Sequence, residues 1–199
     1  FVRVSLELGG KNALVVCDDA EMDVAVESAI QSAFSLAGQR CAAASRIIVM
    51  DGAYDSFRHA FLDRVRSLKI GTGDADDVGP VINARQRDRI LDAVRSAVSS
   101  GATLLSGGNA GEGNGYAVQP TVLEGGAADA EIARQELFGP VTVLFRAKDF
   151  DDAVRLVNDS SYGLTAAIYT NNLHRAQEFA KRAHVGTVHV NGHTFGSEP

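Results

Sequence analysis

Apolar stretches of two kinds alternate along the chain and predict an α/β fold. Short apolar runs are typical of buried strands, whereas longer stretches with apolar residues three and four positions apart are typical of helices. Predicted strands cover residues 12–16, 46–50, 116–118, 122–123, 141–146, 164–169 and 185–190. Predicted helices cover residues 21–37, 53–68, 84–99, 150–159 and 173–183.

The last third of the pattern indicates how the strands pair. Between residues 141 and 190 the order is strand, helix, strand, helix, strand. Parallel strands need such helical crossovers, which are right-handed in almost all proteins. We therefore predict one mostly parallel sheet covered by helices on both faces, with glycine-rich loops at 71–79 and 106–115. Asp18 or Asp19 is placed to cap the helix at 21–37, and Gly38 to end it.

Composition and charge narrow the class of protein. The 199 residues are 45% hydrophobic and 22% charged, as in folded globular chains. A net charge of −6 without clustered Lys and Arg argues against nucleic-acid binding, and no apolar run approaches the ~20 residues that span a bilayer. Two cysteines make no disulfide framework, so a reducing cytoplasm is the simplest compartment. The pattern is cut at Phe1 and Pro199, which indicates a piece of a longer protein.

Cys41 could be a nucleophile or a small buried apolar residue. It follows the predicted helix at 21–37, and Arg40 precedes it. Nearby positive charge favours the reactive thiolate, although adjacency in sequence alone does not aim the Arg40 charge at the sulfur. Taken by itself, the pattern favours the buried alternative, since free cysteine is among the most buried residue types. Cys17 ends a strand, and we assign it that structural role.

Two acidic residues lie beside glycines, where a carboxylate could take part in chemistry. Glu7 sits between two leucines and before two glycines, a setting that predicts partial desolvation and a general-base role. Glu136 precedes Phe138 and a Gly-Pro turn, where it could accept hydrogen bonds from sugar hydroxyls. In the alternative interpretation, Glu7 pairs with Lys11 or with water, Glu136 is a loop charge, and Phe138 fills the core.

Several motifs, in one order and spacing, resemble those of the NAD(P)-dependent aldehyde dehydrogenase superfamily. The family's glutamate motif LELGGK is present at 6–11 and its cysteine motif F-x-x-x-G-Q-x-C at 34–41. The motif E-[IL]-F-G-P-V is present at 136–141, and N-x-x-x-Y-G-L-x-x-x-x-[FY]-T at 158–170. The run GTVHVN at 186–191 is also similar, so the resemblance covers essentially the whole chain.

The resemblance implies the fold of the family's catalytic domain and roles for individual residues. Cys41 would attack an aldehyde to give a thiohemiacetal, which passes a hydride to NAD or NADP and leaves a thioester. Glu7 would activate the water that hydrolyses this thioester to a carboxylic acid. The other implied site residues are Leu8, Gly9, Glu136 and Phe138 at the cofactor, and His193 and Phe195 at the aldehyde entrance. The last two hint at an aromatic aldehyde or a semialdehyde.

The resemblance also implies what accompanies the chain. In the family, a cofactor-binding half precedes the glutamate motif and an oligomerisation strand follows position 199. We therefore expect residues 1–199 to be one catalytic domain that is inactive alone and belongs to a dimer or tetramer when complete. Its partners are a small-molecule aldehyde and copies of itself, without nucleic acid, membrane or metal. Gln135 departs from the family pattern, because many relatives carry a second acid there.

Two alternatives stay open. One is a dehydrogenase that transfers the acyl group to coenzyme A, although in such relatives the base is often not glutamate. The other is a non-catalytic structural relative, whose signature would be loss of Cys41 or Glu7, and both are present. The choice between NAD and NADP stays open as well, because the residue that reads the ribose 2′ position lies in the half that precedes the glutamate motif.

Overall fold

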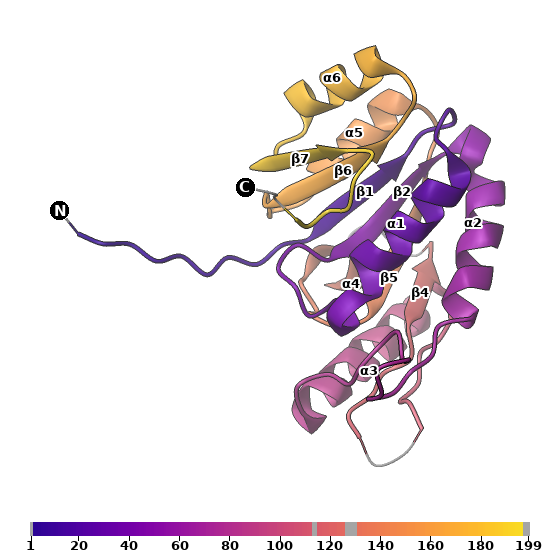
Figure 1. Cartoon of the computed structure of the whole chain (residues 1–199), viewed down its shortest axis with the longest axis vertical. Helices are drawn as coiled ribbons and strands as arrows, with labels where there is room; N and C mark the ends of the chain where they lie inside the picture. The colour runs from indigo at the N-terminus through magenta and orange to yellow at the C-terminus, as the bar shows by residue number, and fades with distance from the viewer. Residues whose placement is uncertain (1, 113–114, 126–130, 197–199) are drawn as a thin grey trace.

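A seven-stranded sheet runs through the residues that the computed structural model describes, which are 2–112, 115–125 and 131–196 (Figure 1). The strands are β1 (Asn12–Val16), β2 (Ala44–Met50), β3 (Thr103–Ser106), β4 (Thr121–Glu124), β5 (Val141–Ala147), β6 (Thr165–Tyr169) and β7 (Thr187–Val190). Their order across the sheet is β3-β4-β5-β2-β1-β6-β7. Every neighbouring pair is parallel except β3 with β4.

Helices cover both faces of this sheet. They are α1 (Met22–Phe34), α2 (Asp51–Arg66), α3 (Ala84–Ser99), α4 (Glu131–Arg134), α5 (Phe150–Asn158) and α6 (Leu173–Arg182). Alternate residues of β1 enter different cores: Leu14 and Val16 pack in the core shared with α1 and α2, and Val15 in the core shared with α5 and α6. The predicted mostly parallel α/β fold, covered on both faces, is confirmed. None of the helices within the described ranges is long and apolar enough to cross a bilayer.

Helix α1 ends earlier than the pattern predicts. It stops at Phe34 rather than at residue 37, and a 3-10 turn over Ser35–Gly38 follows. In this turn Leu36 and Ala37 have φ values of 51° and 55°. These lie in the left-handed region, so the right-handed helix cannot continue through them. Gly38 also has a positive φ, and a Cβ there would collide with the backbone of Gly139. The apolar pattern persists through the turn because Ala37 is still buried, and this hides the helix end from the sequence.

The region between residues 100 and 135 also departs from the prediction. The four-residue elements β3 and α4 were not predicted, since they are too short to show a period. The predicted strand at 116–118 is wrong: Val118 forms only an isolated bridge with Ala110. Residues 113 and 114 of the predicted loop lie outside the described residues.

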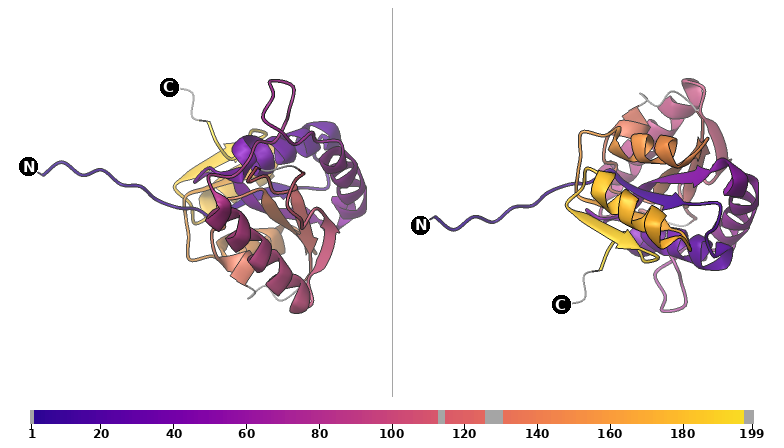
Figure 2. Two further views of the ribbon diagram at one scale, coloured as in Figure 1. Left: turned by 90° about the horizontal axis from the view of Figure 1, so that it is seen from below. Right: turned by 90° about the horizontal axis from the view of Figure 1, so that it is seen from above.

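Residues 2–8 form an extended arm that leaves the body of the molecule before β1 (Figures 1 and 2). Its apolar residues alternate with polar ones, and all four are exposed: Val2, Val4, Leu6 and Leu8. A period of two is typical of a strand with one buried face. The arm therefore has a strand pattern but pairs with no strand in the described part of the chain.

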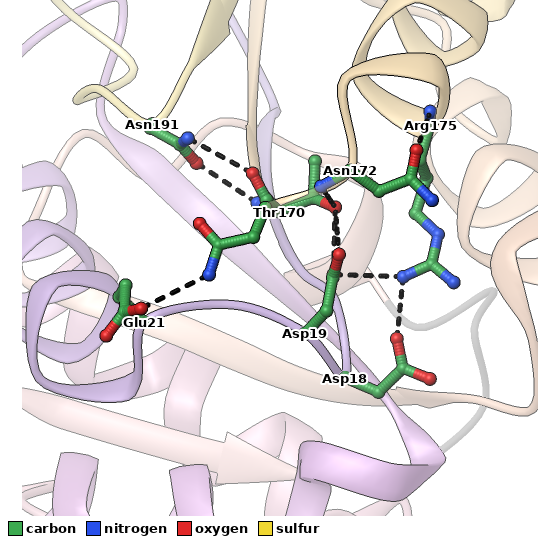
Figure 3. Close-up of polar contacts among 8 residues, drawn as sticks. Asp18, Asp19, Glu21, Thr170, Asn172, Arg175 and Asn191 are labelled. Atoms are coloured by element: carbon green, nitrogen blue, oxygen red, sulfur yellow. Dashed lines mark hydrogen bonds and ion pairs between the residues drawn. The ribbon is translucent and has the colours of Figure 1, made fainter.

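Polar side chains tie together the carboxyl ends of β1, β6 and β7 (Figure 3). Arg175 of α6 lies 2.6 Å from Asp18 and 3.0 Å from Asp19, and the Thr170 hydroxyl donates to Asp19 at 2.8 Å. The Asn191 amide bonds both backbone groups of Thr170, at 3.0 and 3.1 Å. The predicted capping role of Asp18 or Asp19 is therefore wrong, because no side chain caps α1 and both carboxylates bind Arg175.

Candidate active site

The amino ends of β1, β2 and β5 bring three predicted segments together. Because these strands are parallel, the residues just before them, including Gly10, Cys41 and Glu136, lie together at the end of the sheet where the strands begin. The Gly10 N–H donates to Glu136 Oε1 at 3.1 Å. A Cβ on Gly9 would collide with the Glu136 carboxylate, and one on Gly10 with the carbonyl oxygen of Cys41. A side chain at position 10 would therefore separate the backbone of the cysteine turn from the glutamate motif, and one at position 9 would displace the Glu136 carboxylate.

Cys41 is exposed, and its turn is held by hydrogen bonds to the backbone. The Asn12 amide donates to the carbonyl oxygens of Cys41 at 2.7 Å and Ala43 at 3.0 Å, while its own oxygen accepts from the Thr165 N–H at 3.2 Å. On the other side, the Thr194 hydroxyl donates to the carbonyl oxygen of Ala42 at 2.7 Å. Sequence reasoning missed Asn12 and Thr194. A polar residue at the start of a buried strand, directly after the glutamate motif, was the available signal for Asn12.

We expect Asn12→Ala to lower the free energy of unfolding by about 2–4 kcal/mol. The change leaves two carbonyl oxygens and one N–H without their partner, and each buried unsatisfied group costs about 1–3 kcal/mol. Urea denaturation followed by circular dichroism measures the effect. Asn171→Ala is the matched control. Among the described residues this exposed amide bonds only the Glu21 side chain, so a loss within about 0.5 kcal/mol is expected. Equal losses in both variants would contradict the conclusion that Asn12 holds the cysteine turn in place.

Helix α3 fixes the backbone of the turn that carries Glu136 and Phe138. The Gln86 amide donates to the carbonyl oxygens of Leu137 and Phe138, at 2.5 and 3.1 Å. Arg89 donates to the carbonyl oxygen of Glu136 at 3.0 Å. Phe138 has a φ of 55° and is 41% exposed, so the interpretation of Phe138 as a core filler is wrong. The pattern predicts a helix at 84–99 but not the role of its polar face.

Two buried basic side chains, Lys11 and Arg46, lie beneath the site. The Arg46 guanidinium donates to the carbonyl oxygen of Lys11 at 2.9 Å and to those of Leu156 and Val157, at 2.7 and 3.0 Å. Burial lowers the pKa of Lys11 to about 7, with a further contribution from Arg46, and the nearby Glu136 carboxylate opposes this shift. The Lys11 amine is therefore only partly charged at neutral pH.

Glu7 lies in the arm, three residues before Gly10. Its side chain is exposed, so the structure does not show the predicted desolvation, and no ion pair joins it to the buried Lys11. An extended chain spans about 10 Å over three residues. Gly10 lies against the carbonyl oxygen of Cys41. The backbone of Glu7 is therefore within about 10 Å of a residue that contacts the cysteine turn. Leu8, the neighbouring predicted cofactor residue, is also exposed.

The two residues predicted at the aldehyde entrance lie beside the cysteine turn. The rings of His193 and Phe195 stack with centroids 5.2 Å apart, and the Arg40 guanidinium carbon lies 4.0 Å from the centre of the Phe195 ring. Burial, together with the charge of His193, lowers the pKa of His189. No three His, Cys, Asp or Glu side chains in the described ranges are grouped to hold a metal ion. Residues 197–199 of the predicted entrance lie outside the described residues.

Cys17 differs from Cys41 in its exposure to solvent. It is fully buried at the end of β1, and burial raises the pKa of its thiol to about 12. A neutral thiol without solvent access is a poor nucleophile. The structural role predicted for Cys17 agrees with this environment.

Comparison with known proteins relates the whole chain to a single family. The model of the aldehyde dehydrogenase family matches residues 1–199. The 2,5-dioxopentanoate dehydrogenase of Saccharolobus solfataricus is 41% identical over 199 residues, which are 100% of this chain and 42% of that protein. A benzaldehyde dehydrogenase of Bacillus subtilis is 39% identical over 201 residues, covering 100% of this chain and 41% of its own.

A solved structure shows the same fold. The 1-pyrroline-5-carboxylate dehydrogenase from Thermus with bound NAD superposes with a TM-score of 0.92 at 36% identity, over 95% of this chain and 37% of the other. The chain thus spans about two fifths of the length of the relatives that it matches.

Proposed function

The chain belongs to the aldehyde dehydrogenase family, and on that premise we propose that residues 1–199 form the cysteine-bearing catalytic domain of an enzyme that oxidises an aldehyde to a carboxylic acid, with NAD or NADP as the hydride acceptor. The observation that carries the proposal is the meeting of three motif segments at Gly9 and Gly10, which puts Glu136 and the Cys41 turn side by side. A cofactor-binding half before the glutamate motif and a strand used for oligomerisation after residue 199 complete the enzyme.

The residues around Glu136 fit a dinucleotide. The carboxylate uses Oε1 to accept the Gly10 N–H and keeps further lone pairs for ribose hydroxyls. Phe138 is exposed next to it on a backbone that α3 holds rigid, which gives an apolar face for a nicotinamide ring. When bound, the dinucleotide accepts the hydride from the substrate carbon. Gly9 lies against the Glu136 carboxylate, and Leu8 precedes it as the last residue of the arm.

Cys41 performs the first half of the reaction. Its thiolate adds to the aldehyde carbon, and the carbonyl oxygen becomes the oxyanion of a thiohemiacetal. The Cys41 backbone N–H is a donor for this oxyanion, and the clamp of the cysteine turn by Asn12 and Thr194 keeps that group fixed in place. Loss of hydride from the same carbon then leaves an acyl thioester on the Cys41 sulfur.

Glu7 performs the second half. It removes a proton from water, which attacks the thioester carbon and releases the carboxylic acid and the Cys41 thiolate. In the described chain Glu7 is exposed on the arm, so the part of the enzyme that covers the arm must supply its final surroundings. A base at this position favours the free acid over transfer to coenzyme A.

The relatives support an aldehyde substrate without fixing which one. One acts on 2,5-dioxopentanoate and another on benzaldehyde, which parallels the semialdehyde and aromatic classes suggested by His193 and Phe195. For the complete enzyme we expect a homodimer or homotetramer in a reducing compartment such as the cytoplasm, in keeping with two unpaired cysteines.

Iodoacetamide labelling tests the assignment of Cys41. In the complete enzyme we expect Cys41 to be alkylated at least about tenfold faster than Cys17, because Cys17 is buried with its pKa raised to about 12. Peptide mass spectrometry gives both rates, and activity should fall in step with Cys41 alone. Cys17→Ala serves as the control and should label and lose activity like the unmodified protein. Loss of activity with Cys41 still free would refute the assignment.

A further inference from the structure

Lys11 is a buried base that the proposed reaction does not use. Its side chain is 2% exposed, and within the described ranges no hydrogen bond or ion pair involves its amine. It directly follows Gly10, whose N–H donates to Glu136 Oε1 at 3.1 Å, and the Arg46 guanidinium donates to its carbonyl oxygen at 2.9 Å. The backbone at Lys11 is therefore held on one side by Arg46 and on the other, through Gly10, to the Glu136 carboxylate.

Several elements bring charged or titratable side chains towards Lys11 or its neighbour Arg46. They come from β2, the turn before β5, the segment before β6, α4 and the end of α5, and they are Arg46, Glu136, Tyr162, Arg134 and Asp159. Arg134 and Asp159 pair with each other at 2.8 Å. Arg46 stays charged at neutral pH, because burial lowers its pKa only to about 10. Among these groups, the Glu136 carboxylate is the one that favours a charge on Lys11.

The Lys11 amine and the Glu136 carboxylate differ in how much water still reaches them. Lys11 has already lost almost all of its hydration, and this burial lowers its pKa to about 7. Glu136 is only half-buried, so water still screens its charge. A dinucleotide whose ribose lies on Glu136 displaces that water, and unlike charges attract more strongly where the dielectric constant is lower. Covering the carboxylate therefore favours the charged form of Lys11 and adds little to the cost of its burial.

We propose that Lys11 is a positioning residue of the cofactor site, whose amine takes up a proton from the solvent when the dinucleotide covers Glu136. The inference rests on the proposed function and adds a proton to its binding step. The nitrogen lone pair gains the proton and becomes an ammonium, which holds the Glu136 carboxylate against Gly10, and no bond of the cofactor changes. Because the complex binds more protons than the free enzyme, its affinity falls as the pH rises.

Isothermal titration calorimetry of the complete enzyme with NAD or NADP tests the inference without any variant. Titrations near pH 7.5 in two buffers of different ionisation enthalpy give the number of protons taken up with each cofactor, and about half a proton is expected. The dissociation constant should rise about threefold to tenfold between pH 6.5 and pH 8.5, since a shift of one pKa unit corresponds to a tenfold change in affinity.

Three variants separate the charge of Lys11 from its packing. Lys11→Met keeps the length of the side chain without the amine, so binding should take up no proton and the dissociation constant should stay level over this pH range. Glu136→Gln keeps the amine without its attraction and should also take up no proton. Lys181→Met is the matched control: this exposed lysine of α6 pairs with Glu178, so its titrations should equal those of the unmodified enzyme. A merely structural role of Lys11 would change the affinity equally at every pH.

The outcomes separate this inference from the proposed function. If the unmodified enzyme binds the cofactor without proton uptake, or if Lys11→Met or Glu136→Gln keeps that uptake, the role of Lys11 is overturned and the proposed function stands. If neither NAD nor NADP binds at any pH, the proposed function fails with it. Proton uptake that both variants abolish, while Lys181→Met retains it, supports the inference.

Discussion

Replacing Glu7 by Gln in the complete enzyme is expected to lower steady-state turnover by about 10²–10⁴-fold, the usual contribution of a general base. Only hydrolysis of the thioester requires a base that acts on water, whereas the attack by Cys41 and the loss of hydride do not. The variant should therefore release a rapid burst of NAD(P)H and then stall with an acyl group on Cys41. Stopped-flow absorbance measures the burst, and intact-protein mass spectrometry measures the adduct.

The control for this experiment is Glu21→Gln. Glu21 is another exposed acid, but it follows the carboxyl end of β1, at the opposite end of that strand from Gly10, and accepts a hydrogen bond from Asn171 (Figure 3). Its removal should leave turnover and the burst unchanged. Wild-type turnover in the Glu7 variant would exclude the role of general base, and a variant that shows neither burst nor adduct would move Glu7 to an earlier step.

The 199-residue chain by itself is expected to fold but to oxidise aldehydes at least about 10⁴-fold more slowly than the complete enzyme. Two losses multiply. Imprecise placement of the reacting groups costs about a hundredfold per ångström, and the absence of a second oxyanion donor, which we expect from the half that precedes the glutamate motif, costs about 10²–10³-fold. Within this chain, the site around Glu136 provides only the Glu136 carboxylate and the Phe138 ring to bind the whole dinucleotide.

Circular dichroism, calorimetric titration with NAD and NADP, and absorbance at 340 nm test this expectation. A folded chain with no measurable cofactor binding is the expected result. The exposed apolar residues of the arm make self-association at high concentration part of the same expectation, and deleting residues 2–8 is the matched control for it. Robust turnover by the isolated chain would overturn our account of what the remaining three fifths of the enzyme supply.

Elements could be predicted from the sequence where packing sets a regular apolar pattern. They could not be predicted where the backbone conformation decides where an element ends. Strand β1 and helix α6 lie within a residue or two of their predicted bounds, since packing sets their pattern. The end of α1 was missed because Ala37 stays buried after the helix has stopped. For β3, four residues carry no measurable period.

The same contrast holds for the candidate site. Motif residues could be named from the sequence, but their supports could not, because a contact such as that of Thr194 with Ala42 depends on tertiary structure across 152 positions. Asn12 and Gln86 were missed for a related reason: each holds its neighbours through backbone carbonyl oxygens, which every residue type provides. The surroundings of Glu7 were misjudged because two flanking leucines bury a carboxylate only when something covers them.

The position of β1 in the sheet has a consequence for synthesis of the protein. One edge of β1 pairs with β2, which follows soon after, but the other pairs with β6, and its partner for Ala13 is Ala166. At the ribosome's rate of about 5–20 residues per second, roughly 8–30 seconds separate the emergence of these two residues. During that interval an apolar strand in the interior of the future sheet has an unpaired edge, which invites association with other nascent chains. We therefore expect chaperone occupancy on the ribosome to persist until β6 has left the exit tunnel.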